Sequence, residues 1–167
     1  MAVGALSTLA IRPARARAGE QGARSGARRS ELAAWLSALS FAGLGRPAGA
    51  HPDWEREATG IARAWLRLVD EGRQRASWTS AAPLLRQEVG PAEWNAALRA
   101  ARAPLGRCFW RKLQSCAVVE GPTGDLRGPY VVIRFESVFE RGTRATETVT
   151  AMRGPDGGWR VAAYFIG

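Results

Sequence analysis

The chain has little of the chemistry on which most enzymes depend. Its 167 residues include one histidine, His51, so the rest of the chain offers no imidazole as a general base or a metal ligand. A Ser-His-Asp triad and a zinc site are therefore close to excluded. The glycines of the segment 154–158 lie in a turn with no helix after it, so they do not form a phosphate-binding loop. We expect no metal and no cofactor.

Cysteine is also scarce, which argues against a disulfide framework. Cys108 and Cys116 are eight positions apart, and on one continuous strand their Cα atoms would be separated by about 26 Å, far beyond disulfide reach. We therefore predict two unpaired thiols. If neither thiol were free, the strand would be broken or a dimer would be crosslinked.

The chain lacks a long hydrophobic run. Its longest apolar stretch, residues 32–45, is shorter than the ~20 residues of a membrane-spanning helix. Two arginines precede this stretch and small residues follow it, which is the pattern of a secretory signal over residues 30–50. An amphipathic helix is the alternative. Residues 1–29 are rich in Ala, Arg and Gly and predict a disordered extension, with a mis-extended gene start as a second hypothesis. We expect a periplasmic or secreted protein with one domain over residues 51–167.

The formal net charge of +9 is unevenly distributed. Residues 1–50 hold seven arginines and two acidic residues, a net charge of +5, so removal of a leader would remove more than half of the excess. In the remaining domain, cations lie beside aromatic residues as in single-strand nucleic-acid binders: Arg107, Phe109, Trp110, Arg111 and Lys112. Aromatic residues at this density more often form a core, so nucleic acid is not favoured as a partner.

From residue 51 onward the hydrophobic pattern changes once, from helical to alternating. Apolar residues at spacings of three and four predict a first helix from Pro52 to Gly72 with Ile61 and Trp65 on its buried face. Ser80 is the predicted cap of a short second helix that contains Pro83. A third helix runs from Pro91 to Pro104.

Alternation with a period of two then predicts four strands, over residues 107–120, 130–140, 144–153 and 159–166. Along the last strand the pattern places Trp159, Val161, Ala163 and Phe165 on one side. We therefore predict an α+β domain in which three N-terminal helices pack on one face of a curved, four-stranded antiparallel sheet.

One carboxylate is predicted to point into the interior. Alternation places Glu147 on the same side of its strand as Ala145 and Val149, and a buried carboxylate must be paired, hydrogen-bonded or protonated. We favour a structural ion pair with an arginine, for which the candidates are Arg102, Arg107 and Arg111. The alternative is a general base that works with Tyr130 or Tyr164 as proton donor. Asp70, at the end of the first helix, opposes the helix dipole and should also have a specific partner.

The order of several motifs resembles the domain of unknown function 4019 family. The motifs are Trp65-Leu66 with Asp70 and Gly72, Ser77-Trp78, Trp94, Arg102-Ala103-Pro104-Leu105-Gly106, Arg111, Tyr130, Glu147-Thr148-Val149, and Trp159 with Tyr164. The resemblance covers residues 54–166. It implies a small exported bacterial protein with a nuclear transport factor 2-like or cystatin-like cone, and it implies no catalytic residues.

Three functions stay open on this basis. The first is non-enzymatic binding of a small apolar or amphipathic ligand, or of a protein partner, in the cone. The candidate binding residues are Trp65, Trp94, Arg102, Arg107, Arg111, Tyr130, Glu147 and Tyr164. The second is an isomerase-type or lyase-type enzyme that uses Glu147, and the third is a structural envelope protein without a ligand. A homodimer is open as well.

Overall fold

A computed structural model describes residues 51–121 and 128–167. Helices come first: α2 (Pro52–Asp70), α3 (Gln74–Thr79), α4 (Pro83–Glu88) and α5 (Pro91–Arg102). The strands follow: β1 (Cys108–Glu120), β2 (Pro129–Phe139), β3 (Arg144–Arg153) and β4 (Trp159–Ile166), with one 3₁₀ turn at Glu140–Gly142. The predicted extension over 1–29 and the signal-like segment over 30–50 lie outside the described residues.

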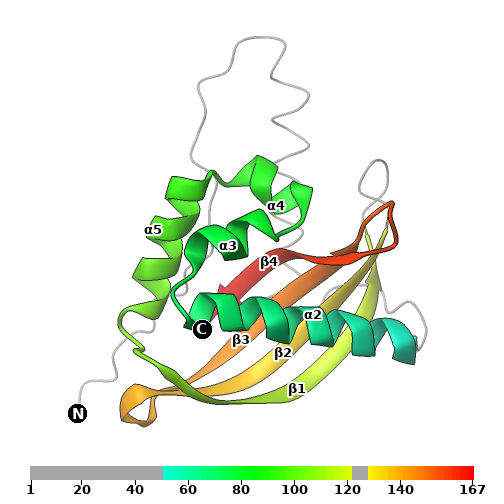
Figure 1. The fold of residues 1–167 in the computed structure, drawn as a ribbon. Coiled ribbons are helices and arrows are strands. Elements are labelled where there is room, and N and C mark those ends of the chain that lie inside the picture. The colour runs from blue at the N-terminus through cyan, green and yellow to red at the C-terminus, as the bar shows by residue number, and fades with distance from the viewer. Residues whose placement is uncertain (1–50, 122–127) are drawn as a thin grey trace.

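The four predicted strands are confirmed, and they form one antiparallel sheet in the order β1-β2-β3-β4. Figure 1 shows the sheet curving around α2, while α3, α4 and α5 gather beyond one end of that helix. Adjacent strands are joined in sequence, as expected for a meander. In the described part of the chain, no helix is long and apolar enough to cross a membrane.

The core lies between α2 and the concave face of the sheet. The buried face of α2 is made of small and large apolar residues that pack against the inward side chains of β2 and β3: Ala58, Ala62, Trp65, Leu66 and Val69 from the helix, and Val131, Ile133, Phe135, Phe139, Ala145, Val149 and Ala151 from the strands. A smaller buried cluster of Val119, Tyr130 and Val132 lies on the opposite face of the sheet.

The helical part differs from the sequence prediction in three ways. Four helices are present in the described part of the chain, not three, because the segment between Gly72 and Ser80, for which no helix was predicted, forms α3. Ser80 does not cap the following helix: it ends α3, and its hydroxyl donates back to the carbonyl oxygens of Ala76 and Ser77. Ile61 is exposed, because the buried stripe of α2 passes through Ala62 and Trp65 instead.

The predicted facing of β4 is wrong over its second half. The pairing of β3 with β4 shifts between Thr150 and Ala151, and this bulge leaves Ala162 without a partner. One extra residue reverses the alternation beyond it. Trp159 and Val161 face the core as predicted, but the later inward residues are Tyr164 and Ile166, while Phe165 faces away from it.

Candidate functional site

A buried carboxylate stands at the centre of a polar cluster inside the core. The side chain of Glu147 on β3 has 0% exposure. Its Oε1 accepts hydrogen bonds from Arg102 Nη1 at 2.7 Å and from the Tyr164 hydroxyl at 2.7 Å. Its Oε2 accepts from Arg111 Nε at 2.6 Å and from the Ser137 hydroxyl at 2.5 Å. Both oxygens are therefore fully engaged, as a buried charge requires.

The same two arginines reach outward to a second carboxylate. Asp70 is the last residue of α2, and its Oδ2 accepts from Arg111 Nη1 at 2.9 Å. Asp70 Oδ1 accepts from Arg102 Nη2. Each arginine thus bridges one buried and one partly exposed acid. Two cations and two anions balance in charge, which lets the group exist in an otherwise apolar interior.

The cluster joins both helices and strands. Arg102 comes from the end of α5, Arg111 from β1, Ser137 from β2 and Tyr164 from β4. The Arg102 guanidinium also lies over the ring of Phe139, 4.7 Å from its centroid, a cation–π contact that adds to its placement. The cluster therefore ties the ends of α2 and α5 to all four strands.

The surroundings shift the acid-base behaviour of the donors. Burial, followed by the nearby Glu147 charge, raises the pKa of Tyr164 well above its ordinary value of 10. Burial alone would lower the pKa of Arg111, but hydrogen bonds to Asp70 and Glu147 outweigh it and raise that pKa. The tyrosine therefore stays a neutral donor and the arginine stays a cation at neutral pH.

Two candidate residues lie elsewhere. Arg107 is not in the cluster: its guanidinium lies 5.7 Å from the centroid of the Phe109 ring, on the surface. Tyr130 lies on the opposite face of the sheet from Glu147, so it is not a proton donor to that carboxylate. Sequence reasoning missed Ser137, although its position two residues from Phe135 and from Phe139 on β2 placed it on the inward side.

Trp65 and Trp94 belong to the packed interior. Their ring centroids are 5.7 Å apart, and the centroids of Trp65 and Tyr164 are 5.5 Å apart in an edge-to-face arrangement. Both indole N–H groups are satisfied at Ser77, one by its carbonyl oxygen at 2.8 Å and the other by its hydroxyl at 3.0 Å. Two buried tryptophans with satisfied N–H groups are typical of a core.

The two edges of the sheet differ. Beside β4, the backbone N–H of Ala82 donates to the carbonyl oxygen of Val161 at 2.8 Å, so the start of α4 covers that edge. Beside β1, no described strand pairs with the outer side. The first half of β1 carries large exposed apolar side chains, Phe109 at 62% and Trp110 at 44%, with Leu113 also exposed. The expectation that these aromatic residues form the core is wrong.

The two cysteines are free, as predicted. Both lie on β1, and each is partly buried against the core. The Cys116 thiol is 3.6 Å from the Thr59 hydroxyl on α2. Burial raises the pKa of both thiols above their ordinary value, which makes them poor nucleophiles at neutral pH.

A family model of proteins of unknown function, DUF4019, matches residues 61–164. The chain belongs to this DUF4019 family. Asp70, Arg102, Arg111, Glu147 and Tyr164 all lie within the matched range. The chain is also similar to the 1.8 Å structure of Aln2 from a Streptomyces species, with 15% identity, a TM-score of 0.45, and coverage of 70% of this chain and 91% of that chain. No curated protein matches it. The nuclear transport factor 2-like cone stays a prediction.

Proposed function

We propose that this DUF4019 domain is a non-enzymatic, exported binding module that takes an extended segment of a partner protein along the open edge of β1. One observation carries the proposal: Phe109 and Trp110 are 62% and 44% exposed on a strand whose outer side no described strand pairs with. An edge strand with exposed aromatic residues offers both backbone hydrogen bonds and apolar anchors to a further strand.

The geometry of Glu147 supports a structural role over a catalytic one. A general base must present a free lone pair within hydrogen-bond reach of a substrate. Glu147 has 0% exposure, and both of its oxygens already accept two hydrogen bonds. A substrate would have to displace an arginine and enter the core to reach it. This disfavours the isomerase or lyase hypothesis.

The packing around α2 also disfavours a ligand held inside the domain. Trp65, Trp94 and Tyr164 are buried, and the Trp65 ring packs against the rings of the other two. A packed interior leaves the surface as the place of binding. A packed interior also fits a structural envelope protein without a ligand. That function is the second candidate, because it leaves the exposed β1 edge without a role.

Charge indicates the kind of partner. Between Cys108 and Val119 the strand has two cations and no acidic residue, and Arg107 precedes it. Arg111 is neutralised by its own acids, whereas Lys112 is exposed. Trp110 and Lys112 are two residues apart and lie on one face of β1. A paired segment with an apolar residue opposite Trp110 and an acidic residue opposite Lys112 would match both side chains.

A second copy of the chain fits this edge less well. A symmetric antiparallel pairing of two β1 strands centred on Lys112 places the two exposed Lys112 side chains opposite each other. Like charges directly opposite each other destabilise a sheet. A heterologous acidic partner avoids that repulsion, so we favour it over a homodimer.

The test is a selection of random linear peptides on the folded domain, followed by titration of the selected peptides. We expect acidic, apolar, extended sequences, and the double variant Phe109→Ser/Trp110→Ser should bind them at least about tenfold more weakly. Amide hydrogen exchange should show protection along the outer edge of β1 when the peptide is bound. Peptides that bind the double variant equally well would refute the proposal.

The matched control is Ile61→Ser, which removes an apolar side chain of 39% exposure from α2 instead of β1. It should leave peptide binding unchanged. Sedimentation of the free protein tests whether a second copy of the chain occupies the β1 edge. Titration with single-stranded oligonucleotides tests whether nucleic acid does. Self-association through β1, or oligonucleotide binding lost in the double variant, would replace the proposed partner. Export rests on residues 30–50, and N-terminal sequencing of the secreted protein tests it.

A further inference from the structure

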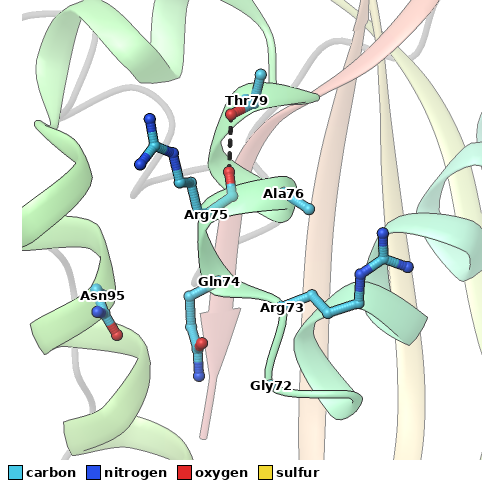
Figure 2. Close-up of a pocket in the computed structure, with 7 residues that line it drawn as sticks. All are labelled: Gly72, Arg73, Gln74, Arg75, Ala76, Thr79 and Asn95. Atoms are coloured by element: carbon cyan, nitrogen blue, oxygen red, sulfur yellow. Dashed lines mark hydrogen bonds between the residues drawn. The ribbon is translucent and has the colours of Figure 1, made fainter.

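Two adjoining surface hollows lie around the start of α3. One has a volume of about 570 Å³ and is lined by Gln74 and Arg75 of α3 and Asn95 of α5 (Figure 2). The other, of about 280 Å³, continues along α5 to the segment before β1. Gly72 and Gln74 line both hollows, so Gln74 stands on the wall between them.

The first hollow has polar groups without protein partners. Figure 2 shows the side chains of Gln74 and Asn95 in the space between α3 and α5, on opposite sides of it. Both residues are half-buried, and in the described part of the chain neither carboxamide makes a hydrogen bond to another protein group. Two carboxamides offer donors and acceptors to a ligand placed between them.

The second hollow has cations without acids. Arg99 and Arg107 line it, are exposed, and form no salt bridge within the residues described. Arg102 also lines it, but Asp70 and Glu147 already neutralise it. Asp70 is the one acidic residue in the described lining of either hollow, and two arginines hold it. The hollow therefore has an excess of positive charge.

The walls add a short apolar surface. Val69 and Leu98, the buried apolar residues that line the second hollow, lie beside its arginines. A small-molecule site is expected to combine such a wall with a few convergent polar groups. The arginine fork matches the geometry of carboxylate or phosphate oxygens.

We propose that these joined hollows bind a small organic oxyanion, with its acidic group at Arg99 and Arg107 and its hydrogen-bonding groups at Gln74 and Asn95. The site adjoins the β1 edge at Arg107, whose guanidinium also lies over the Phe109 ring, but its ligand is a small molecule instead of a protein segment. The proposal therefore does not depend on the proposed function.

The test uses N-acetylglutamate as the probe and its neutral diamide as the matched compound of the same size. Titration is followed by calorimetry and by the side-chain amide resonances of Gln74 and Asn95 at 0.15 M salt. We expect N-acetylglutamate to bind, to shift both resonances, and to bind at least tenfold more tightly than the diamide. Equal affinity for the two compounds, or absence of binding, would overturn the proposal.

Variants separate a site from a general attraction of anions. Arg99→Gln/Arg107→Gln should weaken the binding of N-acetylglutamate at least tenfold, and Gln74→Ala/Asn95→Ala should weaken it severalfold. Arg67→Gln/Arg86→Gln changes the net charge equally at positions outside the hollows and should leave the affinity unchanged. Equal weakening by both arginine pairs would overturn the proposal.

Inorganic phosphate distinguishes the source of the oxyanion. Suppose that inorganic phosphate at a similar concentration displaces N-acetylglutamate, and that N-acetylglutamate does not shift the Gln74 and Asn95 resonances. The site would then hold an adventitious ion only, and the proposal would be overturned. Trp110→Ser, which changes the β1 edge alone, should keep full affinity for N-acetylglutamate. The failure of this proposal and the failure of the peptide-binding proposal are thus distinguishable.

Discussion

The ion cluster has a buried, inner end at Glu147 and a partly exposed, outer end at Asp70, and the two ends can be compared directly. Glu147 and Asp70 are both carboxylates, and both are held by Arg102 and Arg111. Glu147 has 0% side-chain exposure and Asp70 has 25%. The same chemical pairing therefore occurs once in the apolar interior and once at the protein surface.

The difference shows what burial does to an ion pair. Water can take the place of a lost partner at Asp70, but nothing can do so at Glu147. The inner carboxylate is accordingly given two further donors, Ser137 and Tyr164, which the outer one lacks. We infer that the inner end fixes the strands relative to α5, whereas the outer end anchors the terminus of α2.

The largest expected effect is that of Glu147→Gln. The substitution keeps the shape but leaves Arg102 and Arg111 without their buried anion, so we expect the free energy of unfolding to fall by about 3–5 kcal/mol. Urea unfolding followed by tryptophan fluorescence measures it. A loss below about 1 kcal/mol would mean that the interior admits water or another anion, and the comparison with Asp70 would fail.

The matched control is Glu136→Gln. Glu136 pairs with Arg144 at 2.5 Å, but both side chains are largely exposed. Its loss should change the free energy of unfolding by no more than about 1 kcal/mol. A similar loss in the two variants would indicate that charge alone, not burial, determines the cost.

A smaller effect is expected of Asp70→Asn. The asparagine oxygen can still accept one hydrogen bond and water reaches the site, so we expect a loss of about 1–2 kcal/mol in the free energy of unfolding. In the double variant Asp70→Asn/Glu147→Gln the two losses should not add, because the same arginines contact both positions. Strict additivity would show that the two ends of the cluster act independently.

Much of this arrangement follows from local pattern. Four strands, the helices that begin at Pro52 and Pro91, and the inward position of Glu147 all come from periodicity and from proline at a first helical turn. The structural pairing with Arg102 and Arg111 follows from the rule that a buried carboxylate needs cations, although spacing alone left Arg107 as an equal candidate.

The remainder depends on tertiary structure. A bulge at Ala162 carries Tyr164 to the inside, and a bulge of one residue leaves no clear mark in a strand of small apolar residues. The six residues of α3 make too few turns to show a hydrophobic stripe. The glycine before them indicates the end of a helix, so the sequence pattern does not indicate α3. Exposure of Phe109 and Trp110 depends on β1 being an edge, which composition cannot show.

The smallest effect at neutral pH is expected of Tyr164→Phe, and it sharpens the comparison by varying the pH. Removal of one of the four donors to Glu147 should cost about 1 kcal/mol at pH 7. The pKa of Tyr164 is raised in the folded state, so its contribution is full below pH 10 and is lost as the pH rises above 10 toward that raised value. Urea unfolding at pH 8 and pH 11 should therefore show that the free energy of unfolding falls less on going to pH 11 in the variant than in the wild type.

Tyr130→Phe is the control, because burial also raises the pKa of Tyr130 but that ring lies on the opposite face of the sheet. An equal change in the alkaline loss of the two variants would mean that the Glu147 charge does not affect the titration of Tyr164. Burial would then not distinguish the inner end of the cluster from the outer end.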